Sequence, residues 1–418
     1  MLDPNFIRQN VEKAKKATKD KGRDPVLVDK WLKIDQTWRK ILTEVESLRA
    51  ERNKLTDELK KADGKPPQGA LDKGKKIKEE LQNKEKELVK MEREWKEAII
   101  QIPNLPADDV KVGKDESENE VVKTWGDLPK FDFPVKDYQK IGEDLGLIDI
   151  QRAGKTSGSR FGFLTGDLVL LELALLNLAF ETLTEKGFIP VIPPVMLKKE
   201  MEAGLGYAEA GGWDDMYILE KDNLVLTATA EHSLVSRHTE EIVPEKSLPL
   251  KYVGFSTCFR REAGSYGRDT KGILRVHQFN KVEMVVFTRH EDAEETHQEM
   301  VNIEEELMQQ LKIPYRLVKM CSGDLGSPAA KKYDIEAWFP GEEKYRETHS
   351  CSNCTDYQSR RLNIRFSQKG KLEFVYILNG TVFSERPLLA ILENYQQKNG
   401  SVVIPEVLRK WIGKDIIQ

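Results

Sequence analysis

The residues best suited to chemistry lie at 258–285, where the chain reads CFRREAGSYGRDTKGILRVHQFNKVEMV. Apolar ends and the glycines Gly264, Gly267 and Gly272 indicate two strands joined by a long loop. The tetrapeptide FRRE alone could be a salt-bridged pair at a strand end, but the whole charged loop has to be explained at once. An arginine fits chemistry that brings two anions together, because its planar fork stays charged and binds carboxylate and phosphate oxygens.

Two further segments carry oxygen ligands. LTATAEHSL contains Thr229, Ala230 and Glu231, and the carboxylate of Glu231 can accept hydrogen bonds. The tripeptide TAE is weak evidence alone, since Thr229 is also typical of a helix N-cap. YRETHSCSNCTDYQSRR includes Glu347 and Ser350, whose oxygens suit a hard cation.

The cysteines indicate neither a metal centre nor a disulfide framework. Cys351 and Cys354 form a CxxC motif, but no second Cys or His pair at zinc spacing accompanies it, so we expect no structural zinc. The four cysteines and the polar N-terminus MLDPNFIRQN predict a reduced, cytoplasmic protein. The apolar stretch 164–180 is interrupted by charges and is too short for a membrane span. With a net charge of −4, any basic surface has to be local.

Heptad spacing dominates the first quarter of the chain. Apolar positions separated alternately by four and three residues run over 27–59 and again over 77–102, with the turn GKPPQG at 64–69 between them. Two such stripes joined by a short turn can only be buried against each other. We therefore expect an antiparallel coiled coil that extends about 45 Å. A charged helix pair could also serve only as a spacer or a dimerisation element.

The chain is thus predicted to contain an N-terminal domain at 1–103 with a helical hairpin at about 26–102, a linker at 104–137 and a larger domain at 138–418. In the larger domain, apolar helices such as 168–186 alternate with strand-like runs such as KYVGFSTCF, VEMVVF and YDIEAWF. Many strands with few helices between them indicate an antiparallel sheet covered by helices, which is an α+β fold.

The charged segment 258–285 resembles the second signature motif of class II aminoacyl-tRNA synthetases, in the form FRxEAGxxGxDTxGxxRxHQFxKVE used by seryl-tRNA synthetases, and matches each fixed position. FIPVIPPVM, with Pro194, resembles the first motif, and LNGTVFSERPLLAILENYQ resembles the third. The third is about one residue shorter than the familiar NGSGLAVGR form, with Ser384 and Glu385 in place of small apolar residues. Glu385 by itself would be a surface charge.

The resemblance covers nearly the whole chain and implies activation of L-serine by ATP, followed by transfer of serine to tRNA(Ser), and to tRNA(Sec) where that tRNA exists. Arg260 would neutralise the reacting carboxylate and α-phosphate, Glu262 would read the adenine amino group, and the base would stack between Phe279 and Arg386. Core packing is the alternative for Phe279. The implied ATP-binding residues are Arg260, Arg261, Glu262, Arg275, Val276, Phe279, Glu347, Thr348, His349, Ser350 and Arg386, of which His349 stands where the family usually has serine.

The same resemblance implies the rest of the site. Glu347 and Ser350 would hold Mg²⁺, and Arg260, Glu283 and Arg386 would be catalytic. A pocket that binds the serine hydroxyl rejects alanine, so no editing domain is expected. The implied serine-binding residues are Thr229, Ala230, Glu231, Arg260, Glu283 and Thr381.

By analogy with the family, the first motif implies a homodimer and the coiled coil implies an arm that holds tRNA. Residues 26–102 carry 19 basic and 16 acidic side chains, a small excess that suits phosphate contacts. Two other functions compete with this one: an amino acid:carrier-protein ligase, which lacks such an arm, and a non-enzymatic coiled-coil protein with a degenerate domain, which would not keep the set of charged motif residues.

Overall fold

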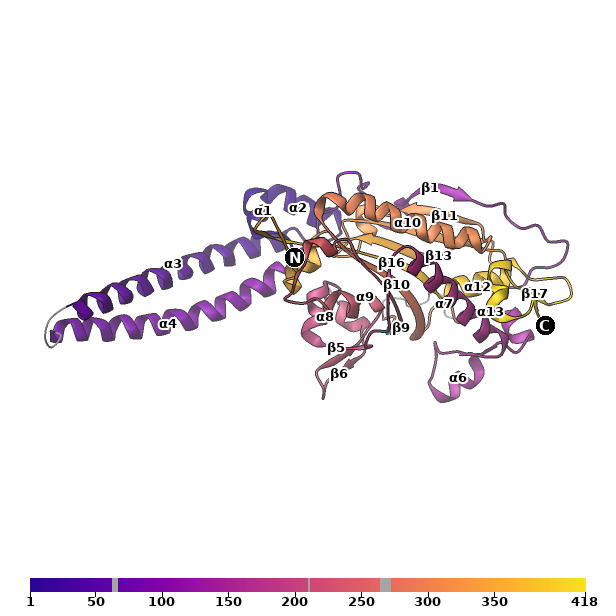
Figure 1. The fold of residues 1–418 in the computed structure, drawn as a ribbon, viewed down its shortest axis with the longest axis horizontal. Coiled ribbons are helices and arrows are strands. Elements are labelled where there is room, and N and C mark those ends of the chain that lie inside the picture. Colours follow the sequence, from indigo (N-terminus) through magenta and orange to yellow (C-terminus); the bar gives the residue numbers. More distant parts are fainter. Residues whose placement is uncertain (62–66, 210, 264–271) are drawn as a thin grey trace. The chain divides into compact units, whose positions relative to one another are not determined.

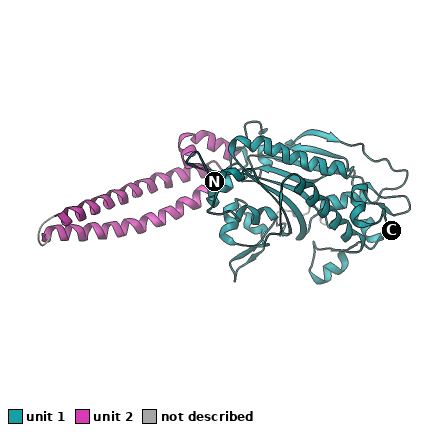
Figure 2. Ribbon diagram, in the orientation of Figure 1, with its two compact units in different colours: residues 1, 20–22, 104–418 teal, residues 2–19, 23–103 magenta. Residues whose placement is uncertain are grey.

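A computed structural model describes residues 1–61, 67–209, 211–263 and 272–418 (Figure 1). Gly264 and Gly267 of the charged loop, and the first half of the GKPPQG turn (64–66), lie outside these residues. The chain divides into two compact units, one of residues 2–19 and 23–103 and one of residues 1, 20–22 and 104–418 (Figure 2).

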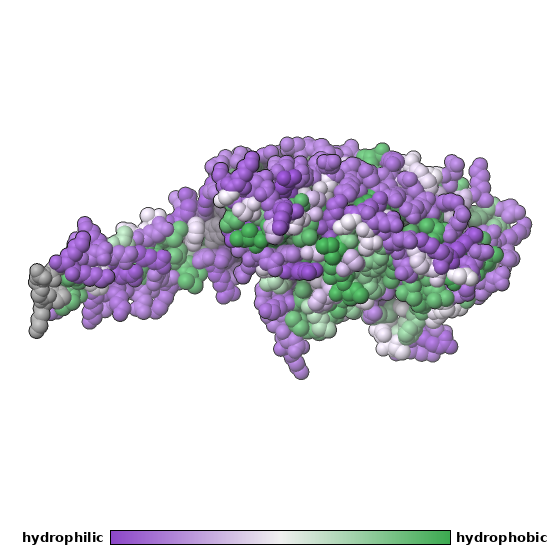
Figure 3. Space-filling view, viewed as in Figure 1, coloured by the Kyte–Doolittle hydropathy of each residue, from purple (hydrophilic) through white to green (hydrophobic). Residues whose placement is uncertain are grey.

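The smaller unit contains the predicted helical hairpin. Its long helices are α3 (Val26–Lys61) and α4 (Gln68–Ile99), and two short helices, α1 (Pro4–Gln9) and α2 (Val11–Asp20), precede them. The two long helices pair closely and are joined by salt bridges such as Arg49–Glu85 at 2.8 Å and Lys84–Glu44 at 2.8 Å. On the face drawn in Figure 3, hydrophilic residues cover most of both helices. The coiled-coil prediction is therefore confirmed.

The buried stripe of α3 differs from the predicted seam at its beginning. Val28 and Asp35 are fully buried, whereas the predicted seam residues Leu27 and Ile34 are only half-buried. Asp35 is tolerated in this position because Arg8 binds both of its carboxylate oxygens, at 2.6 and 2.9 Å, and the indole Nε1 of Trp95 donates to it at 2.9 Å. The heptad pattern assigns apolar residues to the seam, so it could not predict that Asp35 would be buried there.

The larger unit is built around one sheet and is an α+β fold, as predicted. Its helices are α5 (Tyr138–Asp144), α6 (Ile150–Thr156), α7 (Asp167–Glu185), α8 (Lys199–Leu205), α9 (Ala230–Ser236), α10 (Ala293–Gln310), α11 (Tyr357–Leu362), α12 (Glu385–Asn394) and α13 (Arg409–Ile412). The strands of the main sheet are β1 (Glu120–Trp125), β4 (Ile189–Val191), β9 (Leu250–Phe259), β10 (Gln278–Thr288), β11 (Tyr315–Lys319), β12 (Lys331–Phe339), β13 (Lys344–Asn353) and β16 (Tyr376–Ser384).

The eight strands follow the order β1-β11-β12-β13-β16-β10-β9-β4, and all neighbours are antiparallel except β4 and β9. Within the predicted linker 104–137, Glu120–Trp125 pairs with β11 as the first edge strand, so this part of the segment belongs to the sheet. The predicted linker therefore contains a strand. Its acidic and proline-rich composition did not indicate this strand, which forms because it pairs with a strand distant in the sequence.

Smaller sheets complete the unit. They are formed by β2 (Ile148–Asp149) with β3 (Phe163–Leu164), by β5 (Met196–Lys198), β6 (Ile218–Leu219) and β7 (Leu224–Leu226), by β8 (Ile242–Val243), β14 (Arg365–Gln368) and β15 (Lys371–Phe374), and by β17 (Val402–Val403) with β18 (Ile416–Ile417).

The two faces of the main sheet differ: one packs against the apolar core, and the other carries polar side chains. Side chains of α7, α10 and α12 form the large core with Val282, Met284, Val286, Leu378 and Val382 of the central strands. Residues of opposite parity on the same strands, such as Glu283 and Thr381, face away from that core, because neighbouring side chains of a strand alternate between faces. On this second face α9 packs over β9 and β10. The alternation leaves one polar face for a site.

Candidate active site

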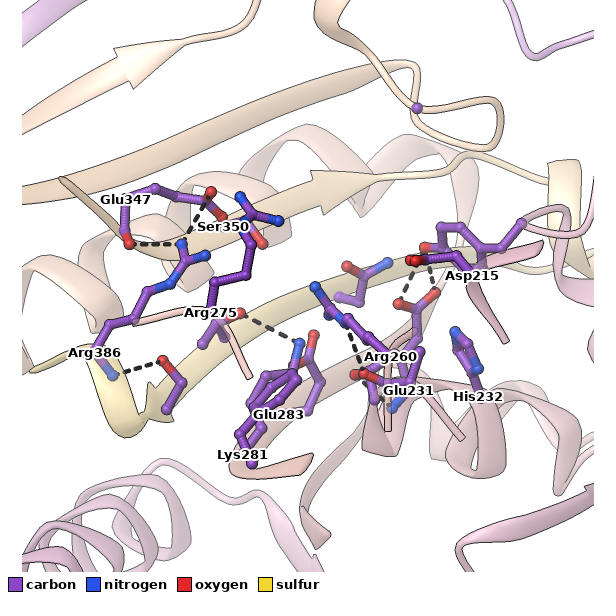
Figure 4. Close-up of a pocket in the computed structure, with 18 of the residues that line it drawn as sticks. Asp215, Glu231, His232, Arg260, Arg275, Lys281, Glu283, Glu347, Ser350 and Arg386 are labelled. Atoms are coloured by element: carbon purple, nitrogen blue, oxygen red, sulfur yellow. Dashed lines mark hydrogen bonds and ion pairs between the residues drawn. The ribbon is translucent and has the colours of Figure 1, made fainter. Parts of the chain in front are cut away.

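A pocket of about 450 Å³ lies on the polar face of the sheet and gathers most of the residues predicted for the site (Figure 4). Its floor comes from β10, β16, β13 and β12, and its sides come from α9 and from the two ends of the charged loop. The predicted residues that line it are Thr229, Glu231, Arg260, Glu262, Arg275, Val276, Phe279, Glu283, Glu347, Thr348, Ser350, Thr381 and Arg386.

Strand register brings distant motif residues into this pocket. Glu283 of β10 lies opposite Thr381 of β16, and Ser352 of β13 lies opposite Asn379 of β16. A register shift between Val282 and Glu283 accompanies the first of these pairs. The short third motif therefore does not displace Thr381, which lines the pocket and is 4% exposed.

Among the residues that the structure describes, three arginines line the pocket, and each is oriented by a specific contact. Arg260 donates through Nε to the carbonyl of Ala228 at 3.3 Å, and its guanidinium lies 5.1 Å from the ring centroid of Phe279. Arg275 forms an ion pair with Glu262. A concentration of fixed guanidinium groups in one cleft is suited to a polyanion such as a nucleotide.

Arg386 enters the pocket from the first turn of α12. Ser384 caps this helix, and its hydroxyl accepts from the backbone N–H of Arg386 at 3.4 Å. The Arg386 guanidinium donates to the carbonyl of Glu347 at 2.8 Å and lies 3.1 Å from the carboxylate of the same residue. Burial raises the pKa of Glu347, but the charges of Arg386 and Lys332 outweigh that effect and hold it at about 2. The carboxylate is therefore ionised at neutral pH.

Two buried carboxylates mark the other end of the pocket. Glu283, 1% exposed, forms an ion pair with Lys281, whereas Glu231, 3% exposed, receives hydrogen bonds from Tyr207 and Gln358. Burial and the nearby Glu231 raise the pKa of Glu283, while Lys281 opposes the rise. Two carboxylates buried in one pocket are costly even with Lys281 beside one of them. A ligand that brings an ammonium group would relieve that cost.

Thr229 shows that the two interpretations of the TAE segment are compatible. Its hydroxyl accepts from the backbone N–H of Glu231 at 3.2 Å and caps α9, and the residue also lines the pocket. The cap fixes where α9 begins, and thus where Glu231 points. A structural role and a site role coincide in one side chain.

Three of the predicted site residues do not line the pocket. Ala230 is fully buried in a second hydrophobic cluster, and Arg261 points to Tyr217, with its guanidinium 5.9 Å from the ring centroid. His349 faces the opposite side of β13: its Nδ1 lies 2.8 Å from the Thr348 hydroxyl, and its ring packs 5.9 Å from that of Phe383. Burial lowers the pKa of His349 to about 4. The histidine is therefore neutral and part of the core, so the prediction of an ATP contact through its side chain is wrong.

Several pocket residues escaped the sequence prediction. Lys281 lies inside the quoted KVE motif, and Asn379 lies inside LNGT, so their motifs were the available signal. His232 follows Glu231 in LTATAEHSL, so that segment was the signal for it. Lys332 and Tyr207 belong to none of the quoted motifs, and only the fold brings them to the pocket.

The interpretation of Glu385 as a surface charge is wrong. Glu385 lines the pocket next to Arg386, and the backbone N–H of Asn280 donates to its carboxylate at 3.4 Å. The Asn280 side chain also donates to Glu172 of α7 at 2.9 Å. Burial, together with the charge of Glu172, raises the pKa of Glu385 to about 8.

In the parts of the chain that the structure describes, no three His, Cys, Asp or Glu side chains gather in the manner of a metal cluster. The four cysteines are free and buried, and burial raises the pKa of both Cys351 and Cys354. No helix among the described residues combines the length and apolar character needed to cross a membrane.

Both units are similar to known proteins. Residues 217–395 match the family model for the tRNA synthetase class II core domain (G, H, P, S and T), and residues 1–106 match that for the seryl-tRNA synthetase N-terminal domain. The serine–tRNA ligase of Dictyoglomus turgidum is 43% identical over 99% of this chain and 98% of its own length.

Solved structures agree with these matches. The seryl-tRNA synthetase of Pyrococcus horikoshii, crystallised with ATP, is 42% identical and superposes with a TM-score of 0.93 over 100% of this chain and 99% of that one. The cytoplasmic enzyme of Naegleria fowleri with AMP is 35% identical, with a TM-score of 0.88 over 100% and 99% of the two chains. With the class II sheet, the charged pocket and these full-length similarities together, the chain belongs to the seryl-tRNA synthetase family.

Proposed function

We propose that this protein activates L-serine with ATP to form seryl-adenylate and diphosphate, and then transfers the seryl group to the 3′ end of tRNA(Ser). The observation that carries this proposal is that two buried carboxylates, Glu231 and Glu283, and the guanidinium of Arg260 line one pocket. Serine presents an ammonium and a hydroxyl to such carboxylates, and its own carboxylate needs a cation beside it.

In the proposed reaction, a carboxylate oxygen of serine attacks the α-phosphorus of ATP, and the bond to the β-phosphate oxygen breaks to release diphosphate. Arg260 neutralises the two anions as they approach, so it stabilises charge that develops in the transition state. Arg275 holds the phosphates, Glu262 reads the adenine amino group, and the adenine stacks between Phe279 and Arg386. No covalent enzyme intermediate is required, because positioning and electrostatics supply the acceleration.

Serine would be recognised at the end of the pocket away from Arg386. Glu231 accepts from the ammonium, and Glu283 and Thr381 bind the hydroxyl, with Thr229 at the wall. A pocket that binds the hydroxyl would reject alanine because its own polar groups would lose a partner.

Glu347 and Ser350 would hold Mg²⁺ against the phosphates. The fit rests on the chemistry of the donors: both line the pocket from β13, and the pKa of the Glu347 carboxyl is held at about 2, so it provides an ionised oxygen at neutral pH. Bound there, the ion would supply positive charge to the phosphate oxygens as diphosphate leaves. Ser350 adds a neutral oxygen of the kind that a hard cation accepts.

We further propose a cytoplasmic homodimer whose helical hairpin binds tRNA. The dimer is supported by apolar side chains exposed on α7 and around β4 and β5, including Leu173 (49% exposed) and Ile192 (83% exposed). The hairpin is supported by the match of residues 1–106 to the seryl-tRNA synthetase N-terminal domain. Backbone and shape contacts suit recognition of an RNA helix, and tRNA(Sec) is a second substrate where it exists.

Serine-dependent exchange of labelled diphosphate into ATP, followed by charging of tRNA(Ser), tests the proposal. We expect exchange with serine and Mg²⁺ and much less with alanine or threonine. Absence of exchange would reject the proposal that the protein activates serine. Exchange without charging of any tRNA instead supports a ligase that uses another acceptor.

A further inference from the structure

The carboxylate of Glu231 is oriented by two donors from different parts of the fold. The hydroxyl of Tyr207 lies 2.8 and 3.1 Å from its two oxygens, and Nε2 of Gln358 donates to one of them at 2.9 Å. Figure 4 shows Glu231 and His232 side by side at the same end of the pocket. Because a carboxylate has about four acceptor positions, these donors leave room for a further donor from a ligand.

Tyr207 is itself held in place by a buried pair. Its ring stacks on that of His232 with centroids 5.2 Å apart and an interplanar angle of 23°. Nδ1 of His232 lies 2.9 Å from a carboxylate oxygen of Glu202, and both of these side chains are at most 3% exposed. Burial lowers the pKa of His232, but Glu202 outweighs that effect and raises it. Glu202 thus fixes the imidazole, and the imidazole fixes the orientation of the phenol ring.

The backbone before Tyr207 is tied to α11. Nε2 of Gln358 also donates to the carbonyl of Leu205 at 3.2 Å, so one carboxamide joins this backbone to Glu231. Arg361 of the same helix donates to the carbonyl of Ala203 at 3.0 Å. Gly206 adopts φ +91°, and a Cβ there would lie 2.8 Å from the ring of Tyr357. The turn that carries Tyr207 therefore depends on a glycine and has little freedom to move.

We propose that Tyr207 is a positioning residue that aims Glu231 at the ammonium of serine, and that His232 and Glu202 hold Tyr207 for this purpose. The inference rests on the proposed function and adds a layer of residues behind the predicted serine contacts. Tyr207 acts through Glu231 and takes no part in bond making. Burial raises the pKa of Tyr207 well above its ordinary value, so its hydroxyl remains a donor at every pH at which the enzyme works.

The chain offers a matched control for this arrangement. Tyr252 also stacks on a histidine, His238, with centroids 5.7 Å apart and an interplanar angle of 24°, and Nδ1 of that histidine lies 2.7 Å from a Glu241 oxygen. The Tyr252 hydroxyl lies 3.0 Å from Nε2 of His238, and neither residue lines the pocket. Tyr252→Phe thus removes a buried hydroxyl from a similar Tyr–His–Glu group that touches no substrate.

The test compares Tyr207→Phe with Tyr252→Phe in the full-length protein by serine-dependent diphosphate exchange and by thermal unfolding. We expect Tyr207→Phe to raise KM for serine about 10- to 100-fold, as for loss of a hydrogen bond to a charged group, with KM for ATP changed less than about twofold. Tyr252→Phe should leave both KM values at those of the wild type. The two variants should differ in KM for serine even where their midpoints of unfolding are similar.

Two results would overturn the inference: an unchanged KM for serine in Tyr207→Phe, or an equal rise in both KM values, which would show general damage to the pocket. If Tyr207→Phe does not fold, Gln358→Met removes the second donor to Glu231 and should also raise KM for serine alone. Loss of exchange in the wild-type protein would reject the proposed function, and so differs from either failure.

Discussion

The guanidinium of Arg386 and the carboxylate of Glu347 form a 3.1 Å ion pair that joins the third motif to β13, the neighbouring strand of the sheet. The same guanidinium donates to the Glu347 carbonyl at 2.8 Å. Arg386 thus neutralises part of the charge of the proposed metal-binding carboxylate. The same two contacts hold Arg386 at the edge of the pocket. Ligand-binding groups that orient each other in this way lose affinity together when one is removed.

Glu347→Gln should raise the Mg²⁺ concentration needed for half-maximal diphosphate exchange at least about 10-fold, because it removes an ionised oxygen ligand. Excess EDTA should abolish exchange in wild type, and added Mg²⁺ should restore it. Glu373→Gln, an exposed position on β15, serves as the control. An unaltered Mg²⁺ dependence in Glu347→Gln would place the ion elsewhere.

Arg260→Ala should lower the rate of diphosphate exchange by about 100-fold or more, as for loss of a group that stabilises transition-state charge. Arg260→Lys keeps the charge but loses the planar fork, so its rate should fall between those of wild type and Arg260→Ala. Rapid-quench measurement of seryl-adenylate formation separates this step from tRNA charging. Near-normal adenylate formation in Arg260→Ala would refute the assignment.

The raised pKa of Glu385 predicts that ATP binding depends on pH. Its pKa is raised to about 8, so the group is largely neutral at pH 7 and gains a negative charge in the pocket as the pH rises through 8. KM for ATP should therefore increase between pH 7 and pH 9 in the wild type, because that charge repels the triphosphate. Glu385→Gln is neutral throughout and should remove this increase, as measured by exchange kinetics at each pH. Identical pH profiles for the two proteins would contradict the prediction.

The raised pKa of Glu385 also makes the stability of the protein depend on pH. The dependence runs opposite to that of an acid whose pKa an ion pair lowers. A carboxyl whose pKa is higher in the folded state than in the unfolded state costs stability as the pH rises above the unfolded value. Glu385→Gln should therefore raise the unfolding midpoint relative to wild type more at pH 8.5 than at pH 4. Thermal unfolding at the two pH values provides the measurement.

The distal half of the helical hairpin should be needed for tRNA charging but not for serine activation. Replacing residues 46–81 by a short glycine-rich turn removes the tip while keeping Asp35, Trp95 and their contacts. Diphosphate exchange should stay within about twofold of wild type, and KM for tRNA(Ser) should rise by about 100-fold or more, as expected when several phosphate contacts are lost. Equal loss of both activities would mean that the hairpin supports folding.

Asp35 should be a critical residue for the smaller unit. Asp35→Ala leaves Arg8 without its buried partner, and removal of one member of a buried pair costs about 3 kcal/mol. The pKa of Asp35 is lowered: burial raises it, but hydrogen bonds from Arg8 and Trp95 outweigh that effect. The stabilisation is therefore present above the unfolded-state pKa and is lost as the pH falls through the folded-state pKa.

Chemical unfolding of the wild type and Asp35→Ala between pH 3 and pH 7 checks both statements. The difference in unfolding free energy should be largest near pH 7 and should shrink in acid. Asp57→Asn, on the exposed surface of the same helix, provides the control. A constant difference across this pH range would contradict the sign argued here.

The sequence by itself determined the features of this protein that depend on residues close together in the chain. Heptad periodicity predicted the antiparallel hairpin, and the alternation of strands with few helices predicted an α+β sheet, since both depend on neighbours in the sequence. The resemblance of the charged segment at 258–285 to a class II motif predicted Arg260, Phe279 and Glu283 as site residues, and all three line the pocket. The TAE segment likewise predicted Glu231, whose direction follows from the adjacent helix cap.

Tertiary structure decided the rest. Strand parity and a register shift placed Thr348 in the pocket and His349 in the core, which no motif match distinguishes. Pairing between strands distant in sequence made Glu120–Trp125 part of the sheet, and burial beside Glu172 turned Glu385 from an apparent surface charge into a pocket residue. The hydrogen bonds that Tyr207 and Gln358 donate to Glu231 join residues 24 and 127 positions apart. Such contacts arise only after the chain has folded, because burial and long-range packing have no local signature in the sequence.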